Sequence, residues 1–485
     1  MTQVLFVTAE CAPFIKAGGL GDVAASLPGA VKGCEVRVVL PYYSCMNDEI
    51  TEFAFHASFV VDFEGGRRRV RVYRAERSGV EHYFLQAPDY FTCGKPYDGD
   101  CGVETRRFAF FACALMAALP ALGYRPDILH LNDWHTGPLA AMIAYRRRHD
   151  PFYANMRTIF TIHNLRYQGV CDRDYMQYCT RLPDEVFDTG GMAWYDRTAN
   201  PMRCGLYYAD RVTTVSERYA EEIQQPEFGE GMDGLLRERS AVVSGIVNGL
   251  DYEVFSPEAD TYLTRGHYGP ADVREGKWRY KEQLQREFGL RIDRDAFLAA
   301  SISRLTDQKG IDLIVAAAGQ LVSRGAQIII TGDGDDRHTR MVNELAKRFP
   351  GQIAAYPVFN EAFSRILYAA ADALLMPSRF EPCGLSQLIA MRYGTVPIVR
   401  RTGGLRDTVT PCEGGAGLGF VFDGYTPGEF DAAFAAAERL YHGDRRAWDA
   451  LIQRDMRADF SWDASAVRYE ALYDGLRDEA LGASR

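Results

Sequence analysis

The stretch Phe297-Leu-Ala-Ala-Ser-Ile302, followed by the polar loop Ser303-Arg-Leu-Thr-Asp-Gln-Lys-Gly310, decides the fold class. A short apolar run that ends in a loop and leads into a helical pattern is the repeating unit of a parallel sheet. The same unit recurs along the second half of the chain, at residues 327–331, 353–356, 373–376 and 395–399. This alternation predicts an α/β domain with helices on both faces of a doubly wound parallel sheet.

The first half of the chain shows the same alternation less regularly. Strands are predicted at residues 4–8, 36–40, 128–131, 158–162 and 211–215, and Ser216 is a good N-cap for the helix that follows. Apolar runs near residues 53–62, 69–73 and 82–85 predict an antiparallel insertion.

The turn Asn248-Gly-Leu-Asp251 follows the apolar run 241–247, and a polar, irregular stretch extends from about 256 to 276. We therefore place a boundary near residue 245. It separates a domain of residues 1–244 from a domain of residues 245–460. Two Rossmann-like domains facing a deep interdomain cleft are the expected architecture.

Composition excludes several classes of protein. The 485 residues are 47% hydrophobic, enough for sizeable cores, and the formal charge is −10, which argues against a nucleic-acid partner. The 11 cysteines contain no C-x-x-C pair, as is typical of reduced intracellular thiols. The N-terminus lacks the basic and apolar regions of a signal peptide. The apolar stretch 108–122 is too short to span a bilayer, so we expect a cytoplasmic protein without membrane contact.

Four loops after predicted strands carry glycines or charges suited to a ligand. Lys16-Ala-Gly-Gly-Leu-Gly-Asp22 opens a helix, where backbone N–H groups favour an anion; an ordinary tight turn is the alternative. Arg304 and Lys309 suit a diphosphate, although a solvated loop would look the same. Glu381 stands before Pro382 and could accept hydrogen bonds from ribose hydroxyls or cap a helix. The fourth loop, Arg401-Thr-Gly-Gly-Leu405, is weak by itself.

Two strand ends in the first half carry histidines and a carboxylate. They read His130-Leu-Asn-Asp-Trp-His135 and Thr161-Ile-His-Asn164. Asp133 beside Trp134 suits carbohydrate binding, with a core tryptophan as the alternative, and His163 is either catalytic or structural. The pairs Asp98-Gly-Asp100 and Asp333-Gly-Asp335 resemble metal-binding D-x-D sequences, but both lie in turns, so no metal site is expected.

Six ordered motifs, from Lys16-x-Gly-Gly-Leu-Gly-Asp22 through Ser303-Arg-Leu-Thr-x-Gln-Lys-Gly310 to Arg400-Arg-Thr-Gly-Gly-Leu405, together resemble bacterial glycogen synthase and plant starch synthase. The resemblance covers essentially the whole chain and includes the tail Phe460-Ser-Trp-Asp463. It implies the GT-B fold and transfer of glucose from ADP-glucose to the non-reducing end of an α-1,4-glucan such as glycogen. It also implies retention of the anomeric configuration, no metal and no cofactor, and a C-terminal helix, residues 461–485, that completes the first domain.

The resemblance assigns roles to residues of this chain. Catalysis would depend on His163, Arg304, Lys309 and Glu381. The donor would be held by Lys16, Gly18, Gly19, Asp22, Asn248, Phe359, Cys383, Gly384, Leu385 and Ser386. Glu10, Tyr97 and Asp133 would bind the glucan acceptor. The chain departs from the family at Ala17, where threonine is usual, so we expect altered local hydrogen bonding there.

Two alternatives stay open at this point. A glucosyltransferase of the same fold could use UDP-glucose, because base contacts are poorly resolved by sequence. A non-catalytic glucan-binding paralogue should have lost the phosphate-binding cations or Glu381, and this chain keeps them. No oligomeric state is predicted from the sequence.

Overall fold

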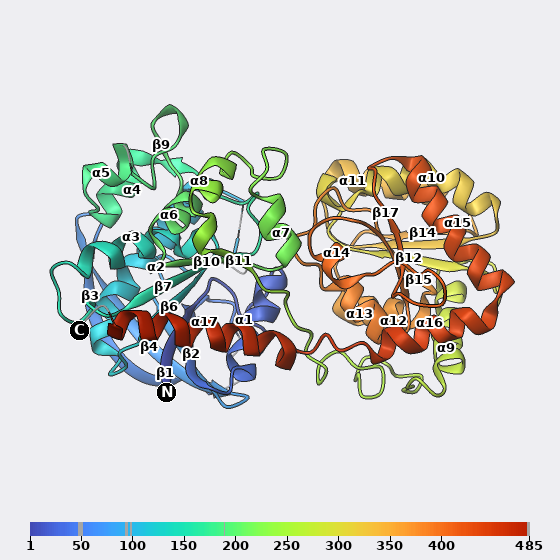
Figure 1. Cartoon of the computed structure of the whole chain (residues 1–485), viewed down its shortest axis with the longest axis horizontal. Coiled ribbons are helices and arrows are strands. Elements are labelled where there is room, and N and C mark those ends of the chain that lie inside the picture. Colours follow the sequence, from blue (N-terminus) through green and yellow to red (C-terminus); the bar gives the residue numbers. More distant parts are fainter. Residues whose placement is uncertain (47–51, 93–95, 98, 189, 483–485) are drawn as a thin grey trace. The chain divides into compact units, whose positions relative to one another are not determined.

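The chain forms two compact units, each with its own sheet and hydrophobic core (Figure 1). The structure is a computed structural model that describes residues 1–46, 52–92, 96–97, 99–188 and 190–482. Unit 1 comprises Met1–Gly249 and Trp462–Arg485, and unit 2 comprises Leu250–Ser461. The chain therefore leaves unit 1, builds unit 2 and returns to finish unit 1.

The sheet of unit 1 is parallel through most of its width. In spatial order its strands are β11 (Val243–Gly245), β10 (Arg211–Thr214), β7 (Arg157–Ile162), β6 (Ile128–Asn132), β1 (Thr2–Val7), β2 (Cys34–Pro41), β5 (Val80–Gln86), β4 (Gly66–Arg77) and β3 (Ala54–Phe63). Neighbours pair in parallel from β11 to β5, whereas β5, β4 and β3 pair antiparallel. The antiparallel insertion predicted for residues 53–85 thus extends the edge of the main sheet.

Burial explains this division of the sheet. Every residue of β6 is buried, as expected for a strand covered on both faces, whereas exposed and buried residues alternate along much of β4. The helices of unit 1 are α1 (Gly19–Ala30), α2 (Cys101–Ala118), α3 (Gly137–Arg146), α4 (Arg173–Thr180), α5 (Asp184–Asp188), α6 (Pro201–Tyr208), α7 (Glu217–Glu222), α8 (Asp233–Glu238) and α17 (Trp462–Gly482). The predicted N-cap is confirmed, because the Ser216 side chain accepts a hydrogen bond from the Tyr219 N–H. None of the helices in the described ranges is long and apolar enough to cross a membrane.

The last helix, α17, packs on the centre of the unit 1 sheet. Its Tyr473 hydroxyl lies 2.7 Å from Nδ1 of His130 on β6. The Thr2 hydroxyl on β1 donates to Asp474 over 2.6 Å, and the Gly33 N–H donates to Glu470 over 3.0 Å. These contacts join the two ends of the chain within one core.

Unit 2 has an entirely parallel sheet. In spatial order its strands are β14 (Ile353–Tyr356), β13 (Gln327–Thr331), β12 (Leu298–Ile302), β15 (Ala373–Met376), β16 (Val396–Arg400) and β17 (Phe420–Phe422). Its helices are α9 (Val273–Glu287), α10 (Ile311–Ser323), α11 (Asp336–Arg348), α12 (Glu361–Ala370), α13 (Ser386–Arg392), α14 (Gly403–Thr408), α15 (Pro427–Gly443) and α16 (Arg445–Arg457). The sequence predicts a doubly wound parallel sheet in this half from the alternation of strands and helices, and the structure confirms it.

The two chain crossings between the units have well-defined contacts. The Leu250 N–H donates to the Phe460 carbonyl over 2.7 Å, which keeps both residues in unit 2. A Cβ on Gly249 would come within 2.5 Å of the Trp462 Cα, so a glycine is required where these segments meet in unit 1. The units consequently divide after residues 249 and 461, and Asn248, which the sequence placed in the second domain, falls in unit 1.

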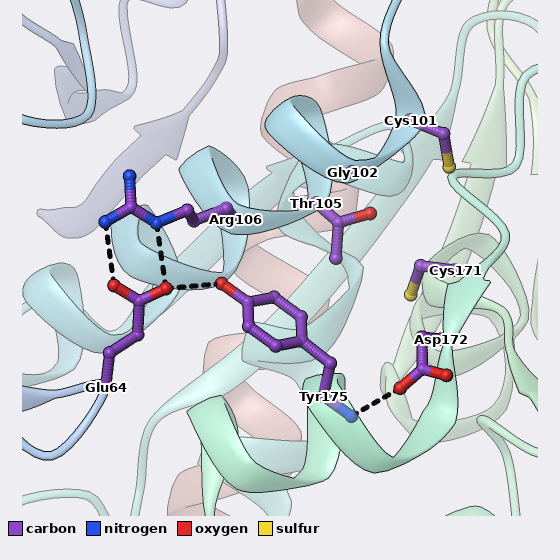
Figure 2. Close-up of a pocket in the computed structure, with 8 residues that line it drawn as sticks. All are labelled: Glu64, Cys101, Gly102, Thr105, Arg106, Cys171, Asp172 and Tyr175. Atoms are coloured by element: carbon purple, nitrogen blue, oxygen red, sulfur yellow. Dashed lines mark hydrogen bonds and ion pairs between the residues drawn. The ribbon is translucent and has the colours of Figure 1, made fainter.

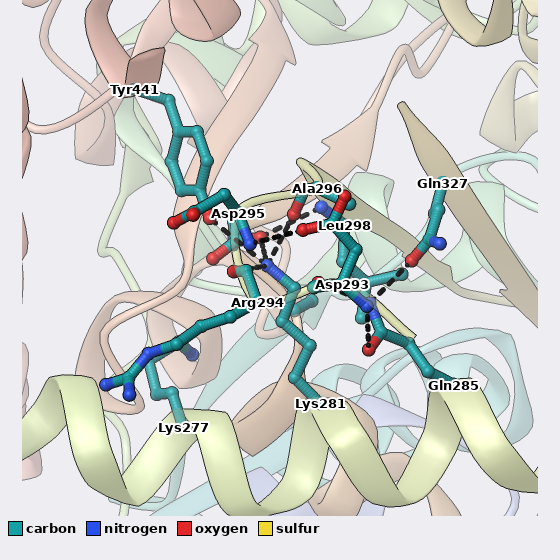
Figure 3. Close-up of polar contacts among 12 residues, drawn as sticks. Lys277, Lys281, Gln285, Asp293, Arg294, Asp295, Ala296, Leu298, Gln327 and Tyr441 are labelled. Carbon is teal, nitrogen blue, oxygen red and sulfur yellow. Dashed lines mark hydrogen bonds and ion pairs between the residues drawn. The ribbon is translucent and has the colours of Figure 1, made fainter. Parts of the chain in front are cut away.

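A buried polar cluster ties α9 to the sheet of unit 2 (Figure 3). Lys281 of α9 reaches into it and forms a 2.7 Å ion pair with Asp372, in which both side chains are largely buried. The same ammonium donates to the Arg294 carbonyl and to the Tyr441 hydroxyl, each over 3.1 Å. Asp372 in turn accepts the Leu298 N–H over 2.8 Å. The cluster satisfies a charge that burial would otherwise penalise.

We expect Lys281→Met to lower the free energy of unfolding by about 3 to 5 kcal/mol, because it leaves Asp372 buried without its cation. Urea denaturation of the full chain measures this change. The control is Arg286→Met on the same helix, whose ion pair with Glu282 lies at the surface and should contribute less than about 1 kcal/mol. Adding Asp372→Asn to Lys281→Met should recover part of the loss. Equal effects of the two single variants would mean that the buried ion pair stabilises unit 2 no more than the surface pair does.

Candidate functional site

Each sheet has one point at which successive strands begin to be added on the opposite side. In unit 1 this switch lies between β1 and β6, and in unit 2 it lies between β12 and β15. Ligands of open α/β sheets bind outside the carboxyl ends of the strands at such points. The motif loops after β1, β6, β12 and β15 therefore stand where the topology favours a site.

The loop after β1 is organised by the buried carboxylate of Glu10. Its Oε2 accepts the N–H groups of Ala17 and Gly18, the latter over 3.0 Å, and the Tyr97 hydroxyl donates to Oε1 over 3.4 Å. Burial raises the pKa of Glu10 above its ordinary value. The sequence predicts the Gly18 N–H as a donor to the ligand, but in the structure it donates to Glu10. The N–H groups of the next residues, at the start of α1, are the ones suited to an anion.

Lys16 lies in the same loop with its ammonium 2.6 Å from Asp22, and both side chains are partly exposed. Gly21 keeps this pair close to the loop, because a Cβ there would meet the Lys16 side chain at 3.1 Å. The structure therefore brings Glu10 together with Lys16, Gly18 and Asp22 of the first motif.

The ends of β6 and β7 form a second part of the same edge. Asp133, directly after β6, accepts the N–H of His163 over 2.7 Å through Oδ1, and more weakly that of Asn164 over 3.4 Å. Its backbone φ is +56°, a strained value for a non-glycine residue. Burial raises the pKa of Asp133 to about 7 and lowers the pKa of His163 to about 3. The imidazole of His163 is accordingly neutral at physiological pH.

The sequence reasoning missed Asn132, the last residue of β6. Its Oδ1 lies 2.9 Å from Nε2 of His163, and it is fully buried. The available signal was an amide side chain at the end of an otherwise apolar strand, next to a motif aspartate.

Tyr97 and Asn248 complete the predicted residues of unit 1. Tyr97 stacks on His135 with ring centroids 4.9 Å apart, and burial raises its pKa well above the usual value. Asn248 is buried, and its Oδ1 has no hydrogen-bond partner in the part of the chain that the structure describes. A buried amide oxygen without a donor is a candidate for ligand binding.

In unit 2, Lys309 and Glu381 meet across the switch point. The Lys309 ammonium lies 2.6 Å from Oε2 of Glu381, with both side chains largely buried, and the Ser378 hydroxyl donates to the same oxygen over 3.1 Å. Arg304 lies on the same loop as Lys309 and is exposed. The arrangement gives a cation held in place by a carboxylate at the carboxyl ends of two neighbouring strands.

Glycines allow these loops to pack closely. Gly310 has φ +70°, and a Cβ there would lie 2.0 Å from the Pro377 carbonyl oxygen. Gly403 has φ +44°, and its Cβ would lie 1.9 Å from the Glu381 carbonyl oxygen, which also accepts the Gly404 N–H. A larger residue in place of Gly310 would push the loop of Lys309 away from the loop of Glu381. A larger residue in place of Gly403 would do the same to the fourth motif.

The remaining predicted residues follow β14 and β15. Cys383, Gly384 and Leu385 form the turn before α13, which Ser386 begins, and Gln387 donates to the carbonyls of Cys383 and Gly384. Phe359 lies on the loop after β14, and its side chain is 60% exposed. Its N–H donates to Asp333 over 2.6 Å.

The candidate metal-binding aspartates have other partners. Asp333 accepts the Phe359 N–H, and Asp335 caps α11 by accepting the His338 N–H. Asp98 lies outside the described residues, and Asp100 caps α2. Within the described ranges, no group of three or more His, Cys, Asp or Glu side chains is placed to hold a metal ion.

Figure 2 shows the residues that line a cavity of about 400 Å³ in unit 1, none of which belongs to these motifs. It is lined by Glu64, Cys101, Gly102, Thr105, Arg106, Cys171, Asp172 and Tyr175, none of which was predicted as a site residue. Glu64 accepts two hydrogen bonds from Arg106 and one from the Tyr175 hydroxyl, and the pKa of its carboxyl falls to about 2, chiefly because of Arg106. These mutual contacts indicate a structural cluster.

Comparisons with known proteins agree along the whole chain. The family described as starch synthase catalytic domain matches residues 3–238, and the family described as glycosyl transferases group 1 matches residues 283–450. A glycogen synthase of Lachnospira eligens is 44% identical over 98% of this chain and 100% of its own length.

Solved structures show the same fold. The catalytic domain of starch synthase IV from Arabidopsis thaliana, bound to ADP and acarbose, superposes with a TM-score of 0.89 at 31% identity, covering 98% of this chain and 99% of that one. Sucrose-phosphate synthase from Thermosynechococcus elongatus, at 19% identity and a TM-score of 0.60, covers 98% and 99% of the two chains and shares the fold. The predicted GT-B fold class is confirmed.

We expect Asp133→Asn to reduce the loss of stability as the pH rises from about 4 to 7. The folded-state pKa of Asp133 is raised from 3.8 to about 7, so the folded protein keeps a proton that the unfolded chain releases in this window. The stability that this proton confers is present below the unfolded pKa and is lost as the pH rises through 7. Each unit of pKa shift corresponds to about 1.4 kcal/mol.

Urea denaturation of the full chain at pH 5 and pH 8 measures the difference between the parent protein and Asp133→Asn. Asp184→Asn, which changes an exposed carboxylate of the same unit, is the control. If the free energy of unfolding changes by the same amount between pH 5 and pH 8 in the parent protein and in Asp133→Asn, burial does not raise the pKa of Asp133.

Proposed function

The chain belongs to the family of bacterial glycogen synthases and starch synthases, and from this premise we propose that it is a retaining glucosyltransferase. Its proposed donor is ADP-glucose, and its proposed acceptor is the non-reducing 4-hydroxyl of an α-1,4-glucan. That the chain is a glycosyltransferase enzyme follows from its relatives; the donor and the stereochemistry are the proposal. The observation that carries it is the Lys309–Glu381 pair at the switch point of unit 2.

Unit 2 is proposed to hold the nucleotide sugar. A diphosphate needs fixed positive charge, which Lys309 and the exposed Arg304 supply at the carboxyl end of β12. Glu381, whose Oε2 also accepts a hydrogen bond from Ser378, keeps the ammonium of Lys309 in one position before the ligand binds, so little reorganisation accompanies charge development. The solved starch synthase structure with ADP bound supports a nucleoside diphosphate as part of the donor.

Phe359 is proposed to stack on the adenine ring. Its ring is 60% exposed on the loop after β14, while Asp333 fixes its backbone N–H. An aromatic side chain offers a flat apolar face that base stacking can cover. The turn Cys383–Leu385 is proposed to present backbone N–H groups to the transferred glucose. Its carbonyls at Cys383 and Gly384 accept hydrogen bonds from the Gln387 side chain.

Unit 1 is proposed to supply Glu10, Tyr97 and Asp133 to the glucan, and Lys16, Asn248 and His163 to the transferred glucose. The unpartnered amide oxygen of Asn248 is suited to accept a hydrogen bond from a sugar hydroxyl. The acarbose bound to the starch synthase relative supports a glucan-like ligand for this family.

The transfer itself is proposed to occur at the front face of the donor. The bond between the anomeric carbon and the phosphate oxygen breaks while a bond to the acceptor 4-oxygen forms on the same face. The proton of the acceptor hydroxyl passes to the departing phosphate oxygen, so atoms and charge balance. Lys309 and Arg304 stabilise the negative charge that develops on the diphosphate.

Hydrogen bonding of the candidate carboxylates supports this route over a covalent glycosyl-enzyme. Retaining glycosidases use one carboxylate as a nucleophile. Here Oε2 of Glu381 is engaged by Lys309 and Ser378, and the carboxylates of Glu10 and Asp133 accept backbone N–H groups. Each of them organises its loop, and such engagement weakens a nucleophile.

We expect Lys309→Ala to lower kcat/KM for ADP-glucose by about 10²- to 10³-fold, the scale of removing one stabiliser of developing charge. Initial rates of glucose incorporation into glycogen measure it, with Lys347→Ala, an exposed lysine on α11, as the matched control. The same assay compares ADP-glucose with UDP-glucose, each with and without EDTA. We expect a preference for ADP-glucose and no effect of EDTA.

Each other outcome has a defined meaning. A preference for UDP-glucose would keep the reaction and replace the donor. No transfer from either donor, in a folded protein that binds glycogen, would favour the non-catalytic glucan-binding alternative. Equal rates for Lys309→Ala and Lys347→Ala would remove Lys309 from the phosphate site.

We expect Phe359→Ala to raise KM for ADP-glucose by about 5- to 100-fold with little change in kcat, because the stacking energy of about 1 to 3 kcal/mol is lost equally in the ground and transition states. Steady-state kinetics with saturating glycogen measure this, and Phe359→Tyr should keep the parent KM. A fall in kcat with unchanged KM would assign Phe359 another role.

A further inference from the structure

Two consecutive residues at the end of β6 hold both the ring and the backbone of His163. Asn132 bonds the ring at Nε2 over 2.9 Å, and Asp133 accepts the backbone N–H over 2.7 Å. The strands β6 and β7 are neighbours in the sheet (Figure 1), and Asn132 pairs in register with Thr161. The sheet thus places this dipeptide beside His163 regardless of any ligand.

The orientation of the Asn132 amide is forced. Its Nδ2 donates to the Val7 carbonyl over 3.0 Å and to the His130 carbonyl over 3.2 Å. Carbonyl oxygens only accept, so the NH₂ group must face them and Oδ1 must face His163. Because Asn132 is fully buried, water offers its amide no alternative partner.

The orientation of this amide decides which nitrogen of His163 carries a proton. Oδ1 of Asn132 only accepts, so Nε2 of His163 must donate and carries hydrogen. Burial lowers the pKa of His163 to about 3, so the ring holds one proton at neutral pH. Nδ1 is then unprotonated, and the described residues give it no hydrogen-bond partner.

The backbone is fixed at the same time. Asp133 holds the His163 N–H while its own N–H donates to the Thr161 carbonyl over 2.9 Å. Asp133 keeps this geometry at φ +56°, a strained value for a non-glycine residue. Strain of this kind persists where the surrounding structure imposes it, and it clusters at functional sites.

We propose that Asn132 is a positioning residue that fixes His163 as the Nε2–H tautomer, so that Nδ1 accepts a hydrogen bond from a hydroxyl of the transferred glucose. The inference rests on the proposed function and deepens it by giving the direction of this hydrogen bond. A group that cannot donate, such as fluorine in place of that hydroxyl, loses the interaction. A sugar carboxylate in the same place would face a lone pair and be disfavoured.

The first test reads the tautomer directly. The full chain, labelled with ¹⁵N-histidine, is examined at pH 7.5 by two-bond ¹H–¹⁵N correlation, and the His163 signals are assigned by their loss in His163→Gln. We expect the neutral Nε2–H pattern in the parent protein and a mixture of both tautomers in Asn132→Ala. A neutral Nδ1–H pattern or an imidazolium in the parent protein would overturn the proposal.

The matched control is Asn200→Ala. Asn200 is also fully buried in unit 1 and accepts the Arg203 N–H as the N-cap of α6, so its loss removes a comparable structural contact. We expect it to leave the His163 tautomer unchanged. A tautomer change of the same size in Asn200→Ala would mean that the effect of Asn132→Ala is general destabilisation.

The second test uses ADP-glucose analogues in which one hydroxyl at a time is replaced by fluorine. At one position we expect the fluorine to lower kcat/KM of the parent enzyme by a factor about 10 to 100 times larger than the factor by which it lowers kcat/KM of Asn132→Ala. Electronic effects of fluorine on the reaction are common to both enzymes and cancel in this ratio. Identical losses in both enzymes at every position would overturn the proposed direction of the bond.

The two proposals fail separately. If unmodified ADP-glucose gives no transfer, the proposed function fails while the tautomer measurement still tests Asn132. If Asn132→Ala does not fold, the tautomer of the parent protein decides, because it needs no variant of Asn132. In that case Asn132→Leu, which has a side chain of similar size but offers Nε2 no acceptor, replaces it in the analogue series.

Discussion

Parallel pairing is the constraint on which the rest of this structure depends. Parallel strands need crossover connections, so all of them end at one edge of the sheet, and the loops that follow lie together there. In unit 1 the loops after β1, β6 and β7 share this edge, and in unit 2 those after β12, β15 and β16 do. Residues more than a hundred positions apart, such as Glu10 and Asp133, thereby lie at the same edge of the sheet.

Buried carboxylates organise these edges. Glu10 gathers the N–H groups of the first glycine-rich loop, Asp133 gathers those at the end of β7, and Glu381 holds Lys309. A carboxylate removed from water requires such donors, and the donors in turn fix the loops that supply them. The acidic side chains therefore determine loop shape first, and any role towards a substrate depends on that shape.

Much of this could be predicted from the sequence, for identifiable reasons. Apolar runs such as 327–331 predict buried strands, and loops rich in glycine and charge after them predict the site, because both patterns are local. An amide beside a motif aspartate was visible in the sequence, but the role of Asn132 could not be derived, since it depends on Val7 and His163, which only the pairing of neighbouring strands brings to it. Likewise, the inward direction of the Gly18 N–H depends on Glu10, eight residues earlier, being buried.

The discontinuity of unit 1 has a consequence for biosynthesis. The ribosome completes Leu250–Ser461 before it reaches α17, so unit 2 possesses its whole sequence while unit 1 still lacks its last helix. Until then the face of β1 and β6 is without Tyr473, and Thr2 is without Asp474. The half of the protein that begins first is therefore the half that matures last, and a chain truncated after residue 461 would carry a complete unit 2 beside a unit 1 without its last helix.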